Sequence, residues 1–227
     1  MLHLPPRLLG GAPHFWRRAM AGRGGRAGAR RGARARGGAG AAWPGWGSRG
    51  RQREALGALL REVEGARGGR CSPEKAAAVG AAAEALEAAA AAPGGGTILS
   101  GRLEGRWDLI YTTESDVHLF QSLGAGEIFQ EIDLEGMRLS NNILFPAGCS
   151  LRAEAPVRVR SADSIEYYFD KIILRVFGLP IPWRLSKGPG GWSRTVFVED
   201  ERVVRNSRGD LLVLRRRATA AGEPPGE

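Results

Sequence analysis

Beyond residue 100, hydrophobic and polar positions alternate in short runs, which is the pattern of strands with one buried face. The clearest run is 151–160, where Leu, Ala and Val alternate with Arg, Glu and Pro. Comparable short runs occupy residues 107–111, 128–133, 137–145, 165–170, 196–198, 203–204 and 211–214. About eight strands at this spacing, with no long helix between them, predict an antiparallel meander that closes as a barrel or folds as a sandwich.

Two helices are expected before these strands. Residues 52–65 place four apolar side chains on one helical face, Leu56, Leu59, Leu60 and Val63. The second helix has Ser72 as its N-cap, is rich in alanine through Ala92, and ends at the Pro-Gly-Gly-Gly of 93–96. Because its apolar face is thin, it can pack closely but buries little area. We therefore expect the helices to brace or cover the strands and not to form the core.

The positive charge of the chain is confined to its N-terminal part. The 227 residues carry a net charge of +9, yet all 24 acidic residues lie at or after Glu54 and 12 of the 33 Lys and Arg precede it. The remainder has 21 basic and 24 acidic residues, a net charge of −3. Arginine-rich, acid-free and aperiodic, residues 1–51 are predicted to be a disordered basic transit peptide. An Arg/Gly-rich RNA-binding tail is the alternative, and the absence of a repeated RGG unit disfavours it.

The residues that carry catalysis or bind metals are sparse. Cys71 and Cys149 form no C-x-x-C pair, and His118 is the one histidine after the leader. No metal site, cofactor or nucleophilic triad is therefore expected. Glu199-Asp200-Glu201 could serve acid–base chemistry if buried, but nearby arginines favour ion pairing. The apolar strand faces could line a ligand cavity or form an ordinary packed core, and the pattern leaves both open.

Five short motifs in sequence order resemble those of the plastid lipid-associated protein (PAP/fibrillin) family. They are LEGRWDLIYTT at 103–113, IFQEID at 128–133, NNILF at 141–145, Ile181-Pro182 followed by Gly191-Trp192, and the closing segment 197–214. The resemblance covers residues 101–217. In the closing segment the spacing from Asp200 to Arg202 is one residue shorter than in the family pattern, and Phe197 stands where the family often has tyrosine.

The resemblance implies a mainly β fold, a lipocalin-like antiparallel β-barrel of about eight strands preceded by two short helices. It divides the chain into a leader (1–51), a helical lead-in (52–97), the barrel (98–217) and a disordered tail (218–227). It also implies a non-enzymatic protein of the plastid that binds or organises apolar lipids or isoprenoids, such as a carotenoid, quinone or acyl lipid. The lipid would lie in a barrel cavity or at plastoglobule or thylakoid surfaces, and a stromal location is the third expectation. The alternative is a structural coat of plastid lipid droplets without a specific internal ligand. No nucleic-acid partner is expected, and no oligomeric state follows.

Six residues are expected to line a ligand cavity: Trp107, Tyr111, Gln130, Asn141, Tyr167 and Phe169. Gln130 and Asn141 are polar residues on apolar strands, and burying them without partners would be costly. We expect them to bond neighbouring backbone; contact with a carbonyl or quinone oxygen of a ligand is the alternative.

A second set belongs to the family motifs and is expected to be structural: Gly105, Asp133, Pro182, Trp192, Asp200, Arg202, Arg205 and Gly209. The glycines suit tight turns, and Pro182 tolerates only an edge strand or a strand start. Arg202 and Arg205 are predicted to pair with Asp200 and Glu201 in a network that closes one barrel end. For both arginines, contact with a ligand headgroup is the alternative.

Overall fold

The computed structural model describes residues 46–64, 66, 71–90, 101–186 and 188–217. Helices α1 (Trp46–Glu64) and α2 (Pro73–Ala90) precede the strands, and α3 (Ser115–Ser122) follows the first strand. The strands are β1 (Gly105–Thr112), β2 (Glu127–Asp133), β3 (Arg138–Phe145), β4 (Cys149–Ser161), β5 (Ser164–Tyr168), β6 (Lys171–Val176), β7 (Leu179–Arg184), β8 (Gly190–Val198), β9 (Glu201–Asn206) and β10 (Leu211–Arg216).

The predicted leader and tail fall mostly outside the described residues. Residues 1–45 and 218–227 are not described, so the predicted disorder of these segments stays a prediction. Residues 46–51 are helical in α1, although the sequence assigns them to the leader. Arg49 and Arg51 are good helix formers, but the segment also contains Gly47, Ser48 and Gly50, so intrinsic helix propensity alone does not account for the extension.

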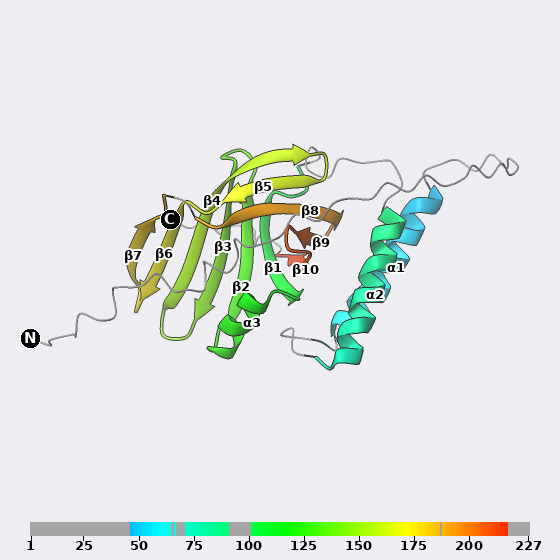
Figure 1. Cartoon of the computed structure of the whole chain (residues 1–227), viewed down its shortest axis with the longest axis horizontal. Coiled ribbons are helices and arrows are strands. Elements are labelled where there is room, and N and C mark those ends of the chain that lie inside the picture. The colour runs from blue at the N-terminus through cyan, green and yellow to red at the C-terminus, as the bar shows by residue number, and fades with distance from the viewer. Residues whose placement is uncertain (1–45, 65, 67–70, 91–100, 187, 218–227) are drawn as a thin grey trace, which may run out of the picture. The chain divides into compact units, whose positions relative to one another are not determined.

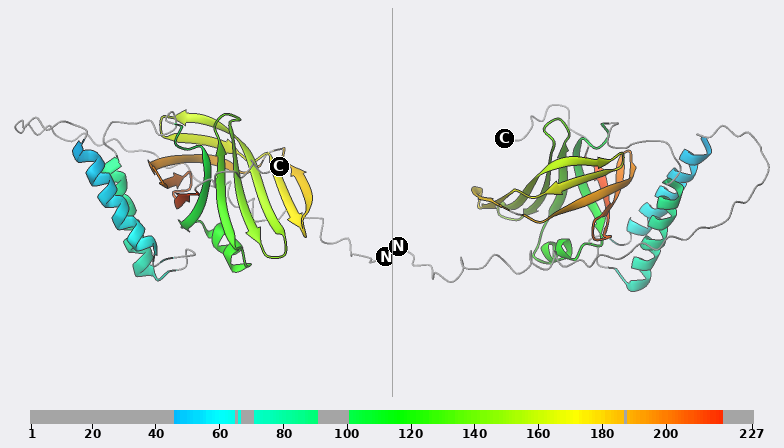
Figure 2. Two further views of the ribbon diagram at one scale, coloured as in Figure 1. Left: turned by 180° about the vertical axis from the view of Figure 1, so that it is seen from behind. Right: turned by 45° about the horizontal axis from the view of Figure 1, so that its top comes forward.

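Eight strands close into an antiparallel barrel. Their order is β3-β2-β1-β10-β9-β8-β5-β4, and β4 pairs back with β3. On its other side, the 13-residue β4 pairs with β6 through its first part and with β5 through its last part. The β6–β7 hairpin therefore branches from the barrel wall, and β7 is a free edge (Figures 1 and 2). The predicted barrel preceded by two helices is confirmed, and closure of the ring rules out a sandwich.

The β6–β7 hairpin is where the sequence prediction falls short. Residues 171–184 were not predicted as strands, and the structure has two there. Pro180 and Pro182 interrupt the β7 pattern because proline cannot donate to a ladder. Since β7 is an edge strand, both prolines are tolerated, as expected for Pro182.

The barrel wall separates two hydrophobic clusters. The outer cluster packs α1 and α2 against the outside of the barrel, and its buried members are Leu56, Leu59, Val63, Ala66, Val79, Ala83, Leu86, Tyr111, Phe197, Val203, Leu211 and Val213. The inner cluster fills one part of the barrel, with Leu103, Trp107, Ile132, Leu139, Val157, Ile165, Val198, Val204 and Leu214 buried. The helices thus brace the wall from outside, as predicted.

One barrel end is closed around Trp107. Its indole Nε1 donates to the carbonyl oxygen of Leu103 over 2.9 Å, and the Arg216 guanidinium lies 4.2 Å from the indole ring centroid. Arg216 also donates to the carbonyl oxygens of Glu104 and Arg102. Gly105 has φ +110° here, and a Cβ at this position would lie 3.3 Å from Arg216 Nη1. The position therefore favours glycine, as the sequence suggested.

Candidate functional site

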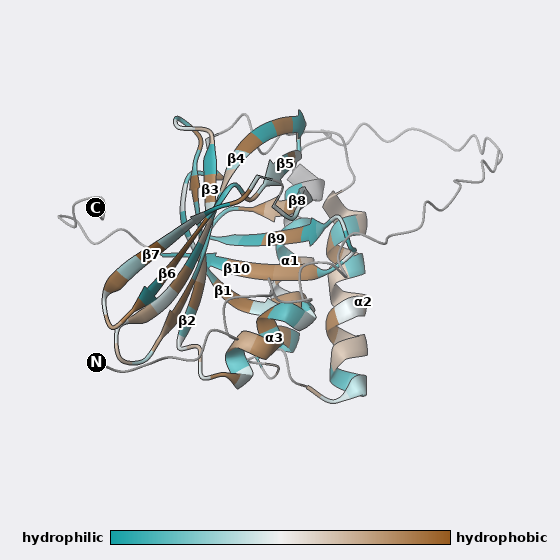
Figure 3. Cartoon of the chain, turned by 60° about the vertical axis from the view of Figure 1, so that its left-hand side comes forward, coloured by the Kyte–Doolittle hydropathy of each residue, from teal (hydrophilic) through white to brown (hydrophobic). Residues whose placement is uncertain are grey.

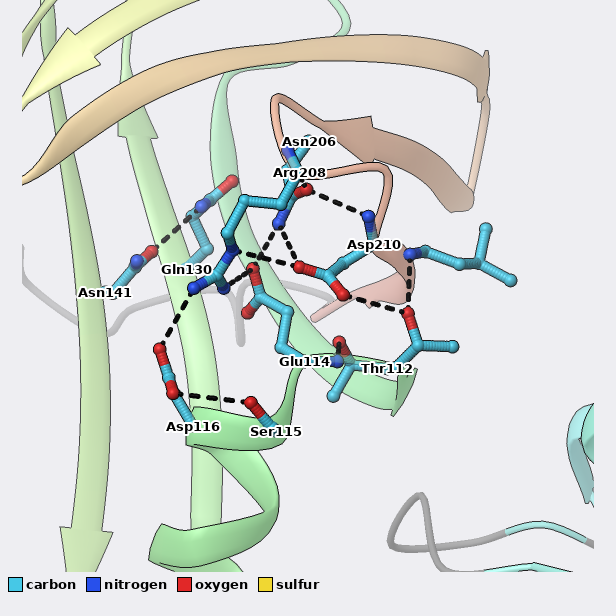
Figure 4. A network of polar contacts seen from close by, with 11 residues as sticks. Thr112, Glu114, Ser115, Asp116, Gln130, Asn141, Asn206, Arg208 and Asp210 are labelled. Carbon is cyan, nitrogen blue, oxygen red and sulfur yellow. Dashed lines mark hydrogen bonds and ion pairs between the residues drawn. The ribbon is translucent and has the colours of Figure 1, made fainter. Parts of the chain in front are cut away.

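The barrel interior holds a small polar group in apolar surroundings. Gln130 on β2 and Asn141 on β3 are direct cross-strand partners, and Gln130 Nε2 donates to Asn141 Oδ1 over 2.9 Å (Figure 4). Arg202 on β9 donates through Nη1 to Gln130 Oε1. The prediction that Gln130 and Asn141 bond to neighbouring backbone is therefore wrong. The two amides bond to each other, and Gln130 also bonds to the buried Arg202.

Arg202 is the most unusual side chain of this group. It is 1% exposed, and no acidic side chain among the described residues pairs with it. Its Nε is buried without any hydrogen-bond partner in the described part of the chain. Burial lowers the pKa of Arg202 to about 10, so the guanidinium is still charged at neutral pH. A buried charge without a counter-charge is costly, and such groups are normally paired.

The predicted network of Arg202 and Arg205 with Asp200 and Glu201 is wrong. The two arginines lie on opposite faces of β9, because residues three apart in a strand face opposite sides. Arg205 Nε pairs with Glu87 of α2 at 2.7 Å, and Glu201 pairs with Arg215. Asp200 is exposed, and its carbonyl oxygen accepts the backbone N–H of Arg216.

Tyr167 lies close enough to Arg202 to feel its charge. Burial, with a smaller contribution from the charge of Glu114, raises the pKa of Tyr167 to about 12, although Arg208 and Arg202 act in the opposite direction. The hydroxyl is therefore neutral, and it makes no hydrogen bond to any described residue. The ring packs edge-to-face on Phe169 with centroids 5.6 Å apart, and Phe169 packs against the inner cluster.

A second polar network lies where the β9–β10 turn meets the start of α3. Asn206 Nδ2 donates to Glu114 Oε1 over 2.6 Å, and Arg208 pairs with Glu114, Asp116 and Asp210 (Figure 4). Burial raises the pKa of Glu114, while Arg208 and Asn206 act in the opposite direction. Because Arg208 ties the β9–β10 turn to the start of α3 through these contacts, we assign the network a structural role at this end of the barrel.

The β6–β7 hairpin carries large apolar side chains on the surface. Phe177 at its turn is 76% exposed and Leu179 is 72% exposed, and Ile181 and Trp183 are also exposed. Both strands show hydrophobic segments at the free edge of the sheet (Figure 3). We call Phe177, Leu179, Ile181 and Trp183 the exposed hairpin set. Residues 177–184 were not predicted to form this surface, although the alternation of Leu179, Ile181 and Trp183 with two prolines indicates an edge strand.

Two unpaired arginines accompany the exposed hairpin set. Arg175 on β6 and Arg184 on β7 are exposed, and neither forms an ion pair with any described residue. By contrast, Arg138 and Arg152 on the adjoining strands β3 and β4 pair with carboxylates. The hairpin therefore combines exposed apolar area with uncompensated positive charge.

The strand register connects the hairpin to the barrel interior. Direct cross-strand partners face the same side of a sheet. One such row runs across six strands: Trp107, Gln130, Asn141, Ala153, Ile172 and Trp183. A second row is Ile128, Ile143, Leu151, Leu174 and Ile181. The inner face of the barrel thus continues onto the hairpin face that carries Ile181 and Trp183.

The remaining predicted residues are spread over the molecule. Tyr111, expected to line the interior, lies in the outer cluster, because a β-bulge between Leu109 and Tyr111 changes the alternation along β1. Asp133 is exposed, and its Oδ1 accepts the N–H of Gly136 in a turn. Trp192 is half-buried below the Arg160 guanidinium. Gly209 has φ +87° in the β9–β10 turn, as expected for a turn glycine.

A cleft of about 800 Å³ lies between α2 and strands β8 and β9. Its lining residues are Glu84, Glu87, Trp192, Arg194, Arg205, Asn206, Ser207, Arg208 and Gly209. Glu87 accepts from both Arg194 and Arg205, at 2.9 and 2.7 Å. This polar, internally paired lining does not suit an apolar ligand.

A family model and a curated relative both relate this chain to plastid-lipid-associated proteins. The model of the PAP_fibrillin family matches residues 53–215. The chain is similar to the probable plastid-lipid-associated protein 11, chloroplastic, of Arabidopsis thaliana, with 28% identity over 121 residues. The match covers 50% of this chain and 56% of that relative, so the chain spans about half the length of the curated relative it matches. No solved structure matches the chain.

Proposed function

We propose, from the premise that this chain belongs to the PAP_fibrillin family, that it is a plastid lipid-associated protein that docks on lipid surfaces through the exposed hairpin set. The word chloroplastic in the name of the Arabidopsis relative supports a plastid location, with the basic leader as its transit peptide. The surfaces would be those of plastoglobules or thylakoids. No helix among the described residues has the length and apolarity needed to span a bilayer.

The single observation that carries this proposal is the exposure of the hairpin. Phe177 and Leu179, at and next to its turn, are about three-quarters exposed, and their transfer out of water would contribute ~3 kcal/mol. Tryptophan favours the interface between headgroups and acyl chains, which suits Trp183, on the same face of β7 as Leu179 and farther from the turn. Arg175 and Arg184 would each add ~1 kcal/mol near an anionic lipid surface.

A lipid surface fits this edge better than another β-sheet does. Pro180 and Pro182 lie within β7, and proline on an edge strand prevents pairing with a further strand. The hairpin can therefore bury its side chains in a lipid layer, whereas its backbone resists edge-to-edge association. Docking of this kind is shared by a lipid-organising protein and by a coat protein.

Flotation of the full chain with vesicles tests the proposal. We expect the protein to float with vesicles of phosphatidylcholine and phosphatidylglycerol, and less with phosphatidylcholine alone. The variant Phe177→Ser/Leu179→Ser/Trp183→Ser should reduce the bound fraction about tenfold. Substitution of Arg175 and Arg184 by glutamine should remove the preference for anionic vesicles while keeping residual binding.

The matched control is Met137→Ser, which removes an exposed apolar side chain from the turn before β3, at the opposite end of that strand from the hairpin turn. It should float like the unmodified chain. Circular dichroism should show that all variants are folded. If the triple hairpin variant floats as well as the Met137→Ser variant, the hairpin is not the docking element.

A further inference from the structure

We infer that the barrel interior binds one carboxylate-headed amphiphile, of the class of a long-chain fatty acid, with Arg202 as the counter-ion of its carboxylate. This goes beyond docking on a lipid surface, which needs no ligand inside the barrel. Its headgroup site consists of residues outside the exposed hairpin set.

Strand β9 carries one arginine that is paired with a carboxylate and one that is not. Arg202 and Arg205 belong to the same six-residue strand, and Arg205 on the outer face has Glu87 as its partner at 2.7 Å. Arg202 on the inner face contacts two neutral groups, Gln130 and, at 5.9 Å from its centroid, the Trp107 ring, and no carboxylate among the described residues. Glu114, whose charge acts on Tyr167, is already engaged by Arg208 and Asn206. The interior therefore lacks one negative charge, which a bound monoanion would supply.

Several hydrogen-bond donors around Arg202 have no partner among the described residues. A guanidinium has five N–H donors in a planar fork that suits the two oxygens of a carboxylate. Arg202 uses Nη1 on Gln130, and its buried Nε has no partner. The neutral hydroxyl of Tyr167 and the amide nitrogen of Asn141 also make no hydrogen bond to described residues. Donors thus outnumber acceptors around Arg202, and an anionic acceptor is what this group can bind.

The single charge of Arg202 indicates how much negative charge the ligand carries. One cation surrounded by neutral groups balances a monoanion. A phosphate dianion or a diphosphate would leave negative charge uncompensated in the interior. A neutral quinone or carotenoid would leave Arg202 unpaired, at a cost that a carboxylate removes.

Two rows of cross-strand partners offer a path for an acyl chain. From Asn141, the inner face continues through Ala153 and Ile172 to Trp183 at the free edge. The parallel row through Leu151 and Leu174 ends at Ile181. A headgroup at Arg202 could therefore direct its chain along these apolar rows toward the hairpin.

The test compares oleate with methyl oleate, which has the same chain and no charge. The full chain is stripped of lipid by organic extraction and refolded, and binding is measured by calorimetry below the micellar concentration. We expect the unmodified chain to bind oleate about tenfold or more tightly than methyl oleate. Arg202→Met should remove this difference by weakening oleate alone. Arg205→Met, which removes one positive charge from the outer face of the same strand, should preserve it.

Thermal unfolding shows whether the Arg202→Met variant is folded. Without ligand it should melt at or above the temperature of the unmodified chain, because an unpaired buried charge has been removed. Oleate should raise the melting temperature of the unmodified chain and not that of the variant. Should the variant fail to fold, the comparison of oleate with methyl oleate on the unmodified chain decides alone.

Equal affinity of the unmodified chain for oleate and methyl oleate would overturn the inference, and so would the absence of binding to both. Vesicle flotation is a separate measurement on the same protein. Arg202→Met should float like the unmodified chain, so a failure of the internal site and a failure of surface docking are distinguishable.

Discussion

The closed barrel end offers the sharpest stability prediction. Trp107 is fully buried, its Nε1 is hydrogen-bonded to Leu103, and Arg216 covers its ring. Trp107→Phe keeps an aromatic ring but removes the donor, which leaves the buried carbonyl oxygen of Leu103 without a partner at a cost of about 2 kcal/mol. The smaller ring and its weaker attraction for the Arg216 cation add about 1 kcal/mol. We therefore expect the free energy of unfolding to fall by about 3 kcal/mol.

The assay is urea unfolding of the full chain followed by far-ultraviolet circular dichroism, which does not depend on the substituted tryptophan. The midpoint should fall while the slope with urea stays constant, as expected when stability changes and compactness does not. The matched control is Trp183→Phe, in the exposed hairpin set, which should change stability by less than about 0.5 kcal/mol. If Trp107→Phe costs no more than this control, the indole hydrogen bond and the Arg216 contact do not hold the barrel end.

Two further predictions concern charged groups. Burial raises the pKa of Glu114 above 4.5, so its contribution to stability is present at low pH and is lost as the pH rises from 4.5 through the folded-state value. The free energy of unfolding, measured by urea titration at several pH values, should therefore fall across this range, and Glu114→Gln should remove this part of the pH dependence. An unchanged pH dependence in the variant would contradict the assignment. Glu87→Gln removes the charge that Arg194 and Arg205 share, and should cost about 1 kcal/mol at low ionic strength and less in about 1 M salt. A cost independent of salt would mean that packing of α2, and not these ion pairs, is what the substitution disturbs.

Alternation and spacing predicted the barrel because most strands have one face inside and one face outside. Leu151, Ala153, Ala155 and Val157 alternate with polar residues, and the structure buries them at least partly, as the pattern requires. Tyr111 shows where this reasoning fails. A single bulge in β1 shifts it to the outer cluster, and a bulge leaves no mark in the order of apolar and polar residues.

The polar residues were harder to place than the apolar ones. The spacing from Asp200 to Arg205 suggested a local ion-pair network, because sequence neighbours are the only partners that a sequence displays. The actual partners of Arg202 and Arg205 are Gln130 and Glu87, which lie 72 and 118 residues away in the chain. Only closure of the ring and packing of α2 bring them together. Sequence reasoning could therefore single out these arginines but not assign one to the interior and the other to the helix.

The divided pairing of β4 is the feature that links the two proposed lipid contacts. If β4 paired with β5 along its whole length, β6 would have no free part of β4 to pair with. Instead, residues 150–154 of β4 pair with β6, and the inner face of the barrel is carried outward to β7. Ile181 and Trp183 then belong both to the surface proposed to meet lipid and to the rows that lead back to Asn141. Under the two proposals, an amphiphile could move between a lipid layer and Arg202 along one apolar face without its chain crossing water. It follows that Trp183→Ser should slow the transfer of oleate from vesicles to the protein more than it weakens oleate binding at equilibrium. Stopped-flow transfer measured beside calorimetry would show this, and equal effects on rate and affinity would separate the hairpin from the internal site.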